Sequence, residues 1–116
     1  MMRLIYVSGP LTADTKGKTL GNIEAATQAT RELMDAGFAV ICPHLSYYLL
    51  TPNWNPSHDD WLRVDVEILR RCDAVLMLPG WLHSKGACME RAHAITHNIP
   101  DVTSIEELID YPWRDV

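Results

Sequence analysis

Short apolar runs recur along the chain, and each ends at a glycine, a proline or a polar residue. The first, Leu4 to Val7, is followed by Ser8-Gly9-Pro10, and the second, Phe38 to Cys42, stops at Pro43. A continuous apolar run of this length is typical of a strand that is buried on both faces. We therefore predict strands at 4–7, 38–42 and 74–78, and a short one near 99–102.

The stretches between these runs carry helix signals. Asn22 is a candidate N-cap for a helix that ends near Ala36, where Gly37 provides a stop. Further helices are predicted from His58 or Asp59 through Cys72, from about Gly86 to His97, and at 104–110. Strands that alternate with helices imply parallel βαβ units. We expect one α/β domain over residues 1–116, a flavodoxin-like or Rossmann-like three-layer sandwich with a four- or five-stranded parallel sheet.

Residues 43–57 separate the second strand from the next helix. They contain Pro43, Pro52 and Pro56, which predict an irregular or briefly helical segment. A connection of this length in a compact domain is often functional.

Composition narrows the classes of function. Of the 116 residues 47% are apolar, which is enough for a modest core around a single sheet. The formal net charge is −5 and the ten basic residues are scattered, which argues against binding to a nucleic-acid backbone. A small anionic ligand is compatible with this charge because it needs only a local group of donors.

Cysteine usage and hydropathy bear on the compartment. Cys42, Cys72 and Cys88 are widely spaced and form no C-x-x-C motif, so we expect reduced, buried thiols. The apolar run at the N-terminus is too short for a signal peptide, and no later segment approaches a membrane span. We expect a cytoplasmic protein with no membrane and no nucleic-acid partner.

One acidic residue lies where a helix is expected to be apolar. On a helical wheel the apolar stripe of residues 61–72 consists of Trp61, Leu62, Ile68, Leu69 and Cys72. Asp65 falls in the middle of this stripe. A buried carboxylate must be partnered or have its pKa raised, and either condition is common at functional sites. The alternative is an acid near one end of the buried face that hydrogen-bonds to a neighbouring loop.

A second acid, Glu90, has two interpretations. The apolar face of the helix at 86–97 is predicted to consist of Cys88, Met89, Ala92 and Ile95. Glu90 points away from this face, and the pattern alone predicts a solvated acid near a helix N-terminus. Topology favours a functional role, because helix N-termini that follow strand ends line the ligand crevice of open α/β sheets. Gly86 and Ala87 would also leave room for a ligand against backbone N–H groups.

Three other chemistries fit the sequence less well. Glu90, His93 and His97 form half of a metal-binding pattern, but carboxylate-bridged di-iron sites need the motif on two helices. Cys88 beside His93 is a conceivable nucleophile, but a position on the apolar face favours packing in the core. The glycine-rich dinucleotide and P-loop motifs are absent. We expect neither a metal nor an organic cofactor.

Five segments together resemble the nucleoside 2-deoxyribosyltransferase-like family, most closely its small bacterial and phage members and the related deoxynucleoside monophosphate N-glycosidases. The segments are YVSGPLT at 6–12, GNIEAA at 21–26, Trp61, DVEILRRCDAVLMLPGW at 65–81 and SKGACME at 84–90. The most specific feature is the spacing of Asp65, Cys72-Asp73, Ser84 and Glu90. The resemblance extends to about residue 100.

The resemblance implies roles for the matched residues. Glu90 corresponds to the nucleophilic glutamate of the family, and Asp65 to the helix aspartate that helps to protonate the leaving base. Ser84 corresponds to the loop serine that holds the sugar or a 5′-phosphate, while Tyr6 and Gly9 match the loop that lies along the nucleoside. The full set of substrate-binding candidates is Tyr6, Ser8, Gly9, Asn22, Trp61, Gly80, Ser84, Lys85 and Gly86.

The implied reaction is cleavage or exchange of the N-glycosidic bond of a 2-deoxynucleoside or its 5′-monophosphate. Glu90 would attack the anomeric carbon while Asp65 protonates the departing base, as in a retaining glycosidase. Water or a second base would then resolve the glycosyl-enzyme. The first loop lacks the basic residue of phosphate-recognising members, so Lys85 beside Ser84 is the alternative source of charge. The alternative function is a nucleotide-binding module that has the pocket without turnover.

Two expectations concern aromatic side chains. Tyr47, Tyr48, Trp54 and Trp61 could stack on a base, although for each of them a place in the core is the simpler interpretation. The resemblance also implies a homo-oligomer, and Tyr111 or Trp113 could lie in its interface.

Overall fold

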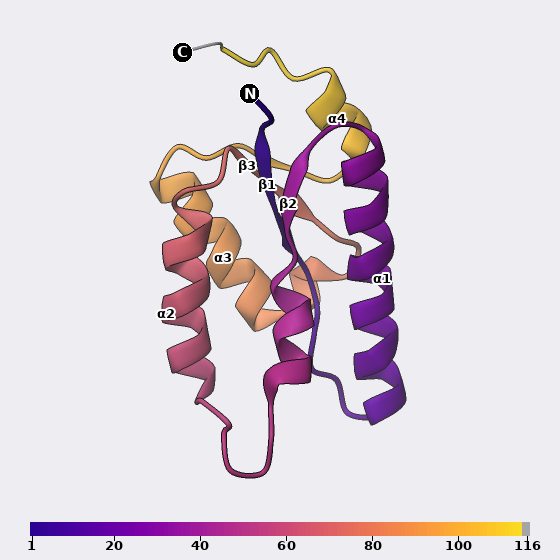
Figure 1. Ribbon diagram of the computed structural model, residues 1–116. Coiled ribbons are helices and arrows are strands. Elements are labelled where there is room, and N and C mark those ends of the chain that lie inside the picture. Colours follow the sequence, from indigo (N-terminus) through magenta and orange to yellow (C-terminus); the bar gives the residue numbers. More distant parts are fainter. Residues whose placement is uncertain (115–116) are drawn as a thin grey trace.

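The structure is a computed structural model that describes residues 1–114. Its centre is a sheet of four parallel strands in the order β2-β1-β3-β4, of which Figure 1 labels the first three. The strands are β1 (Leu4–Ser8), β2 (Ala39–Ile41), β3 (Ala74–Met77) and β4 (Asp101–Val102). In the register, Tyr6 of β1 lies opposite Ile41 of β2 on one side and Val75 of β3 on the other.

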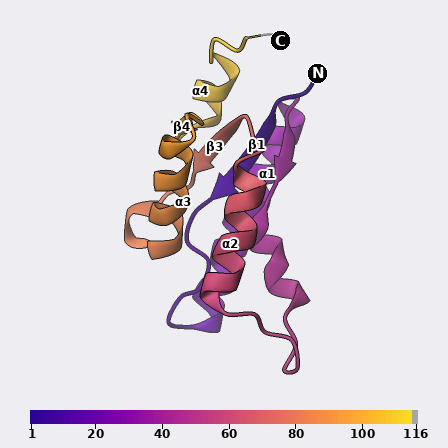
Figure 2. The same cartoon turned by 90° about the vertical axis from the view of Figure 1, so that its left-hand side faces the viewer.

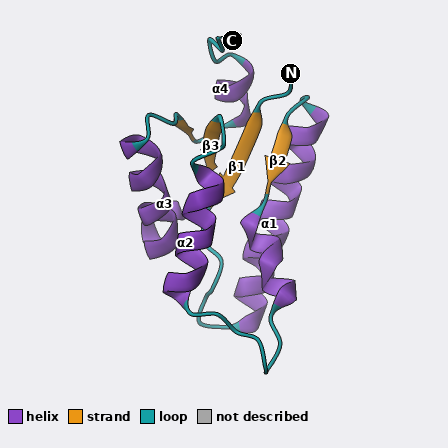
Figure 3. Ribbon diagram, turned by 60° about the vertical axis from the view of Figure 1, so that its left-hand side comes forward, coloured by secondary structure: helices purple, strands orange, loops and turns teal. Residues whose placement is uncertain are grey.

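Helices cover both faces of this sheet. They are α1 (Lys16–Asp35), α2 (His58–Leu69), α3 (Lys85–Thr96) and α4 (Ile105–Ile109), with the short 3-10 helices η1 (Pro43–Leu49) and η2 (Trp81–His83). Figure 3 shows the strands between α1 on one side and α2 and α3 on the other, and Figure 2 shows α2 in front of β1. The predicted three-layer parallel α/β architecture is confirmed.

The core has two halves because side chains along β1 alternate between the faces. Ile5 and Val7 pack with Leu33 of α1 on one face. Tyr6 packs with Leu69 of α2 and other residues on the opposite face. The two halves together hold the sheet between its helices. Within residues 1–114 no helix is long and apolar enough to span a membrane.

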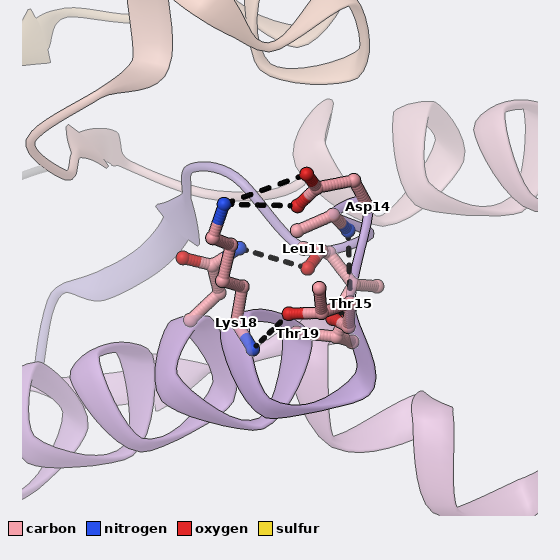
Figure 4. Close-up of polar contacts among 7 residues, drawn as sticks. Leu11, Asp14, Thr15, Lys18 and Thr19 are labelled. Atoms are coloured by element: carbon pink, nitrogen blue, oxygen red, sulfur yellow. Dashed lines mark hydrogen bonds and ion pairs between the residues drawn. The ribbon is translucent and has the colours of Figure 1, made fainter.

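The start of α1 differs from the prediction, because the helix begins at Lys16 rather than near Asn22. Thr15 is the N-cap, and its hydroxyl accepts a hydrogen bond from the Lys18 N–H at 3.1 Å (Figure 4). The glycines and polar residues of the first turns mimic a loop in sequence, and the cap and later packing override them.

Asn22 lies inside α1 and holds the preceding loop. Its amide donates to the carbonyl of Leu11 at 2.9 Å, and Thr19 accepts from the N–H of Ala13 at 2.9 Å (Figure 4). The loop between β1 and α1 is therefore tied to the first two turns of the helix.

The remaining boundaries agree more closely with the sequence. The chain leaves α1 at Gly37, whose φ of 96° and N–H bond to the Met34 carbonyl complete a left-handed cap together with the bond from Phe38 to Leu33. A capping box of Ser57 and Asp60 starts α2 at His58. The helix ends at Leu69, three residues before the predicted end.

The C-terminal segment packs on its own chain. The indole N–H of Trp113 donates to the Leu108 carbonyl at 3.0 Å, and its ring lies against the core half that contains Leu33. The guanidinium of Arg3 lies 5.2 Å from the centre of this ring. Trp113 therefore has an intramolecular role, and the place of Tyr111 or Trp113 in an interface between copies stays a prediction.

The thiols are free, as expected. Cys42 and Cys72 are buried, whereas Cys88 is only half-buried and is not the core residue that the sequence predicted. Burial raises the pKa of Cys72 to about 11, so this thiol stays protonated near neutral pH.

We predict opposite effects of alanine at two glycines of this fold. Gly37→Ala should lower the free energy of unfolding by about 1 to 2 kcal/mol, because a left-handed backbone costs an L-residue that much. Gly21→Ala should raise it by about 0.5 to 1 kcal/mol, because Gly21 is exposed inside α1 and a Cβ there meets open space. Urea unfolding of both variants and wild type measures the difference. Shifts of the same sign in both variants would contradict the cap geometry.

Candidate active site

A cavity of about 620 Å³ opens at the carboxyl ends of the strands. The strand order reverses between β1 and β3, and ligands of open α/β sheets bind in the crevice at such a switch point. The walls come from the loop after β1, from η1 and the segment behind it, and from the first turns of α2 and α3. The polar and aromatic residues of the lining include Thr12, His44, Tyr47, Asn55, His58, Trp61, Asp65, Ser84, Lys85 and Glu90.

Glu90 lies in the wall of this cavity as a buried carboxylate, with 9% of its surface exposed. Both of its oxygens accept hydrogen bonds from the end of β1. The Ser8 hydroxyl donates to Oε1 at 2.9 Å, and the Tyr6 hydroxyl donates to Oε2. Tyr6 and Ser8 are themselves fully buried.

The predicted orientation of Glu90 is therefore wrong. The buried face of α3 consists of Ala87, Glu90 and Ala94, whereas Ile95 is 50% exposed. Two alanines let the helix approach the sheet closely, and Glu90 projects between them toward β1. The wheel missed this face because it assigned burial to the larger apolar side chains.

Burial dominates the electrostatics of Glu90. Loss of hydration raises the pKa of this carboxyl to about 7, and the nearby Asp65 carboxylate adds to the rise. The hydrogen bonds from Tyr6 and Ser8 favour the charged carboxylate and therefore oppose this rise in pKa. Burial, with the charge of Glu90 beside it, also raises the pKa of the Tyr6 phenol, so this hydroxyl keeps its proton and acts as a donor.

Asp65 is the second carboxylate of the cavity. It is half-buried on α2, facing inward as the wheel predicted. Within residues 1–114 its carboxylate has no hydrogen bond and no ion pair, and burial raises its pKa to about 6. Of the two conditions stated for a buried acid, the raised pKa is the one that the structure shows.

Most other predicted site residues also meet at this cavity. Gly9, Trp61, Ser84, Lys85 and Gly86 all line it. The Ser84 hydroxyl caps α3 by accepting from the Ala87 N–H at 3.2 Å, which leaves the hydroxyl proton available to a ligand.

Gly9 has a packing reason of its own. A Cβ at this position would lie 2.8 Å from the Cβ of Leu78, which is closer than side-chain carbons approach. The loop can follow the cavity wall only without a side chain here.

Tyr6 and Ser8 hold Glu90 but do not line the cavity, and two further predicted binding residues, Asn22 and Gly80, also lie outside this lining. Asn22 holds the Leu11 carbonyl from α1. Gly80 has a φ of 87° and lines a smaller hollow of about 200 Å³ with Trp81 and His83. Both shape loops beside the cavity and are not placed to touch its contents.

The structure adds cavity residues that the sequence did not single out. His44, Asn55 and His58 belong to or follow the long segment 43–57, whose length was the signal for function. His44 also comes just after the carboxyl end of a strand, where ligand-binding residues of parallel sheets gather.

The four aromatic side chains at positions 47, 48, 54 and 61 are not in the core, in contrast to the simpler interpretation of the sequence. Tyr48 is 65% exposed and Trp54 49% exposed. Tyr47 and Trp61 are half-buried and line the cavity, with Trp54 packed edge-on against Trp61.

The alternative chemistries lack a matching geometry. His93 and His97 stack on each other, and His97 Nδ1 lies 2.8 Å from the His93 carbonyl. Among the described residues, no three histidine, cysteine or acidic side chains cluster as metal ligands would. The Cys88 thiol lies at the Trp81 and Leu82 carbonyls and outside the cavity lining.

Comparisons with known proteins identify the family and the fold. Residues 3–102 match the family described as a domain of unknown function (DUF4406), and the chain belongs to this family. The fold is similar to that of a solved 2-deoxyribosyltransferase from the psychrotolerant bacterium Bacillus psychrosaccharolyticus, with a TM-score of 0.58 and 19% sequence identity. The likeness covers 84% of this chain and 69% of that one. No curated protein matches the sequence.

The buried Glu90 should make stability depend on pH. Between the ordinary pKa of 4.5 and the folded value of about 7, the folded chain keeps a proton that the unfolded chain releases. Stability therefore falls as pH rises through this window. Glu90→Gln removes the titrating group. Its free energy of unfolding should exceed that of wild type by up to about 3 kcal/mol at about pH 8 and differ little from it at about pH 5.

Thermal or urea unfolding of both proteins at the two pH values measures this effect. Glu106→Gln, at an exposed acid of α4, is the matched control and should give the same small difference at both. A Glu90→Gln difference that does not grow with pH would contradict the raised pKa.

Proposed function

We propose that this protein cleaves or exchanges the N-glycosidic bond of a 2-deoxynucleoside or its 5′-monophosphate, with Glu90 as the nucleophile. The carrying observation is the Glu90 carboxylate, buried in the cavity wall and held by Tyr6 and Ser8, with the Asp65 carboxylate facing the same cavity. The fold shared with a solved 2-deoxyribosyltransferase supports the proposal.

The first step is attack at the anomeric carbon. An oxygen of Glu90 forms a bond to this carbon, the carbon–nitrogen bond breaks, and its electron pair leaves with the base. Asp65 gives its proton to the departing nitrogen. The products are a glycosyl ester on Glu90, a neutral base and an Asp65 carboxylate.

The second step regenerates the protein. Water or the nitrogen of a second base attacks the same carbon, and the ester oxygen returns to Glu90 as a carboxylate. Asp65 takes the proton that the attacking group loses. Hydrolysis and transfer therefore differ only in the acceptor, and both use the same two carboxylates.

The surroundings suit a transition state with positive charge on the sugar. A carboxylate that has left water interacts strongly with a developing cation, because the local dielectric is low. Tyr6 and Ser8 keep this carboxylate oriented before the substrate arrives, so little reorganisation is needed during the reaction.

The cavity also accommodates the rest of the substrate. Its volume of about 620 Å³ lies within the range of small-molecule sites. The rings of Tyr47 and Trp61 offer faces for a base, and Lys85 at the start of α3 offers a charge for a phosphate.

The two pKa values restrict the active state. Attack requires an ionised Glu90, with its pKa of about 7, and a protonated Asp65, with its pKa of about 6. Between these values only a minor fraction of the molecules holds both groups in the required states, because the group with the higher pKa must be the ionised one. Protonation therefore restricts turnover at every pH.

The direct test is release of free base. Wild type is incubated with 2-deoxyadenosine, 2-deoxyguanosine, 2-deoxycytidine, thymidine and their 5′-monophosphates, with and without a second base, and products are separated by chromatography. Glu90→Ala should reduce release by on the order of a thousandfold or more, because no covalent intermediate can form. Glu106→Gln should retain full activity.

Detection of a covalent adduct is a second test of the same proposal. Wild type quenched in acid during turnover should carry the mass of one deoxyribosyl group on the peptide with Glu90. Tight binding measured by calorimetry, with no base release from any compound, would overturn the enzymatic proposal in favour of a binding module.

Asp65 generates its own prediction. The pH profile of kcat for wild type should be bell-shaped, with a maximum between about 6 and 7, because activity requires Glu90 to lose a proton and Asp65 to keep one. Asp65→Asn should lower kcat by roughly a hundredfold and abolish the alkaline limb. For a substrate whose base leaves without protonation, such as 7-methyl-2-deoxyguanosine, Asp65→Asn should lower kcat much less. An unchanged alkaline limb in Asp65→Asn would exclude it as the acid.

A further inference from the structure

We propose that Nδ1 of His44 is a binding group of the same site and accepts a hydrogen bond from a sugar hydroxyl of the bound substrate. This inference rests on the function proposed above and adds a recognition element for the sugar. His44 is not one of the site residues predicted from the sequence.

The first observation is an unpaired atom. His44 is 4% exposed, and its Nδ1 is the sole buried side-chain nitrogen or oxygen in residues 1–114 without a hydrogen-bond partner. A buried polar atom without a partner is costly, so it persists where function requires it or where a ligand supplies the partner.

The second observation fixes what this atom can do. His44 Nε2 lies 3.0 Å from the carbonyl oxygen of Pro10. A carbonyl can only accept, so Nε2 carries the proton and Nδ1 presents a lone pair. Burial lowers the pKa of His44, although the carbonyls of Pro10 and Gly9 oppose this shift, so the ring is neutral. The missing partner is therefore a donor.

The third observation is position. His44 lines the cavity, and it follows β2, the strand beside β1. Its ring contacts the carbonyl of Pro10, so His44 lies against the loop that follows β1. Gly9 follows Ser8, whose hydroxyl holds the nucleophile Glu90. His44 thus contacts the loop two residues beyond the serine that positions the reacting carboxylate.

This position selects the ligand group. During the reaction the anomeric carbon is bonded to Glu90, so the atoms next to it belong to the sugar. A 2-deoxyribosyl group carries hydroxyl donors within a few bonds of that carbon, whereas the base departs toward Asp65. The sugar hydroxyls are the donors that a lone pair on His44 can meet, and the 3-hydroxyl belongs to the ring itself.

Two substitutions separate ligand binding from support of the loop. His44→Asn retains an acceptor oxygen near the place of Nδ1 and loses the donor to Pro10. His44→Gln retains a donor that can reach Pro10 and lacks an acceptor at the place of Nδ1. If Nδ1 binds the sugar, His44→Gln should raise KM roughly tenfold while His44→Asn stays within about threefold of wild type.

The ligand provides a matched second arm. Binding is measured by calorimetry in the Glu90→Gln background, which removes turnover, with the best substrate of the panel and its 2,3-dideoxy analogue. His44→Gln should weaken binding of the 2-deoxy compound roughly tenfold and leave that of the dideoxy analogue unchanged, because the donor is missing there. Circular dichroism and unfolding of each variant confirm that the fold is intact.

The outcomes are distinguishable. If wild type releases no base and binds no member of the panel, the proposed function fails and this inference fails with it. If wild type is active, either of two results would mean that His44 only supports the loop at Pro10. In the first, His44→Gln weakens binding of both ligands by the same factor, and in the second, His44→Asn binds the 2-deoxy compound more weakly than His44→Gln does. If neither variant changes binding, Nδ1 has no ligand role.

Discussion

Two hydroxyl groups on one carboxylate connect the central strand of this protein to the helix that crosses it. Tyr6 and Ser8 are two residues apart on β1, so both side chains emerge on the same face of the sheet and reach the two oxygens of Glu90 together. A shift of the strand by one residue would turn both hydroxyls toward α1. One constraint therefore fixes three features, because the orientation of the carboxylate, the position of α3 on the sheet and the register of β1 cannot change independently.

This constraint has a cost that the fold tolerates. A carboxyl with a pKa of about 7 is held out of water beside a second acid, and the hydroxyl donors only partly compensate for the lost hydration. Apolar side chains in the same place would make a more stable protein. The surrounding core, with Ile5, Val7 and Leu33 on the opposite face, supplies the stability that this arrangement gives up.

The fold was predictable from sequence where one local rule decides the structure. Continuous apolar runs located the strands, and Gly37 marked the end of α1 because a left-handed residue is needed there. The beginning of α1 was not predictable from propensity, since it depends on the cap at Thr15 and on the hydrogen bonds that join Thr19 and Asn22 to the preceding loop. The site divides in the same way. The inward direction of Asp65 followed from its apolar neighbours, whereas burial of Glu90 depends on small alanines and on partners from β1, which no wheel of α3 contains. The position of His44 after a strand end was a signal in the sequence, whereas the missing partner of its Nδ1 is visible only in the structure.

The cavity has two kinds of wall, and they differ in how freely they can change. Tyr6, Ser8, Asp65 and Glu90 project from β1, α2 and α3, regular elements that pack on the sheet. Leu50, Asn55 and Pro56 of the wall belong to the irregular segment after η1, where Leu50 and Trp54 are partly exposed and the backbone makes a local bridge between Thr51 and Trp54. Substitutions, insertions and deletions in that segment can reshape the cavity without moving Glu90. The range of ligands can therefore diverge among relatives of this chain through the segment at 50–57, while the carboxylate and its two hydroxyl donors keep their arrangement.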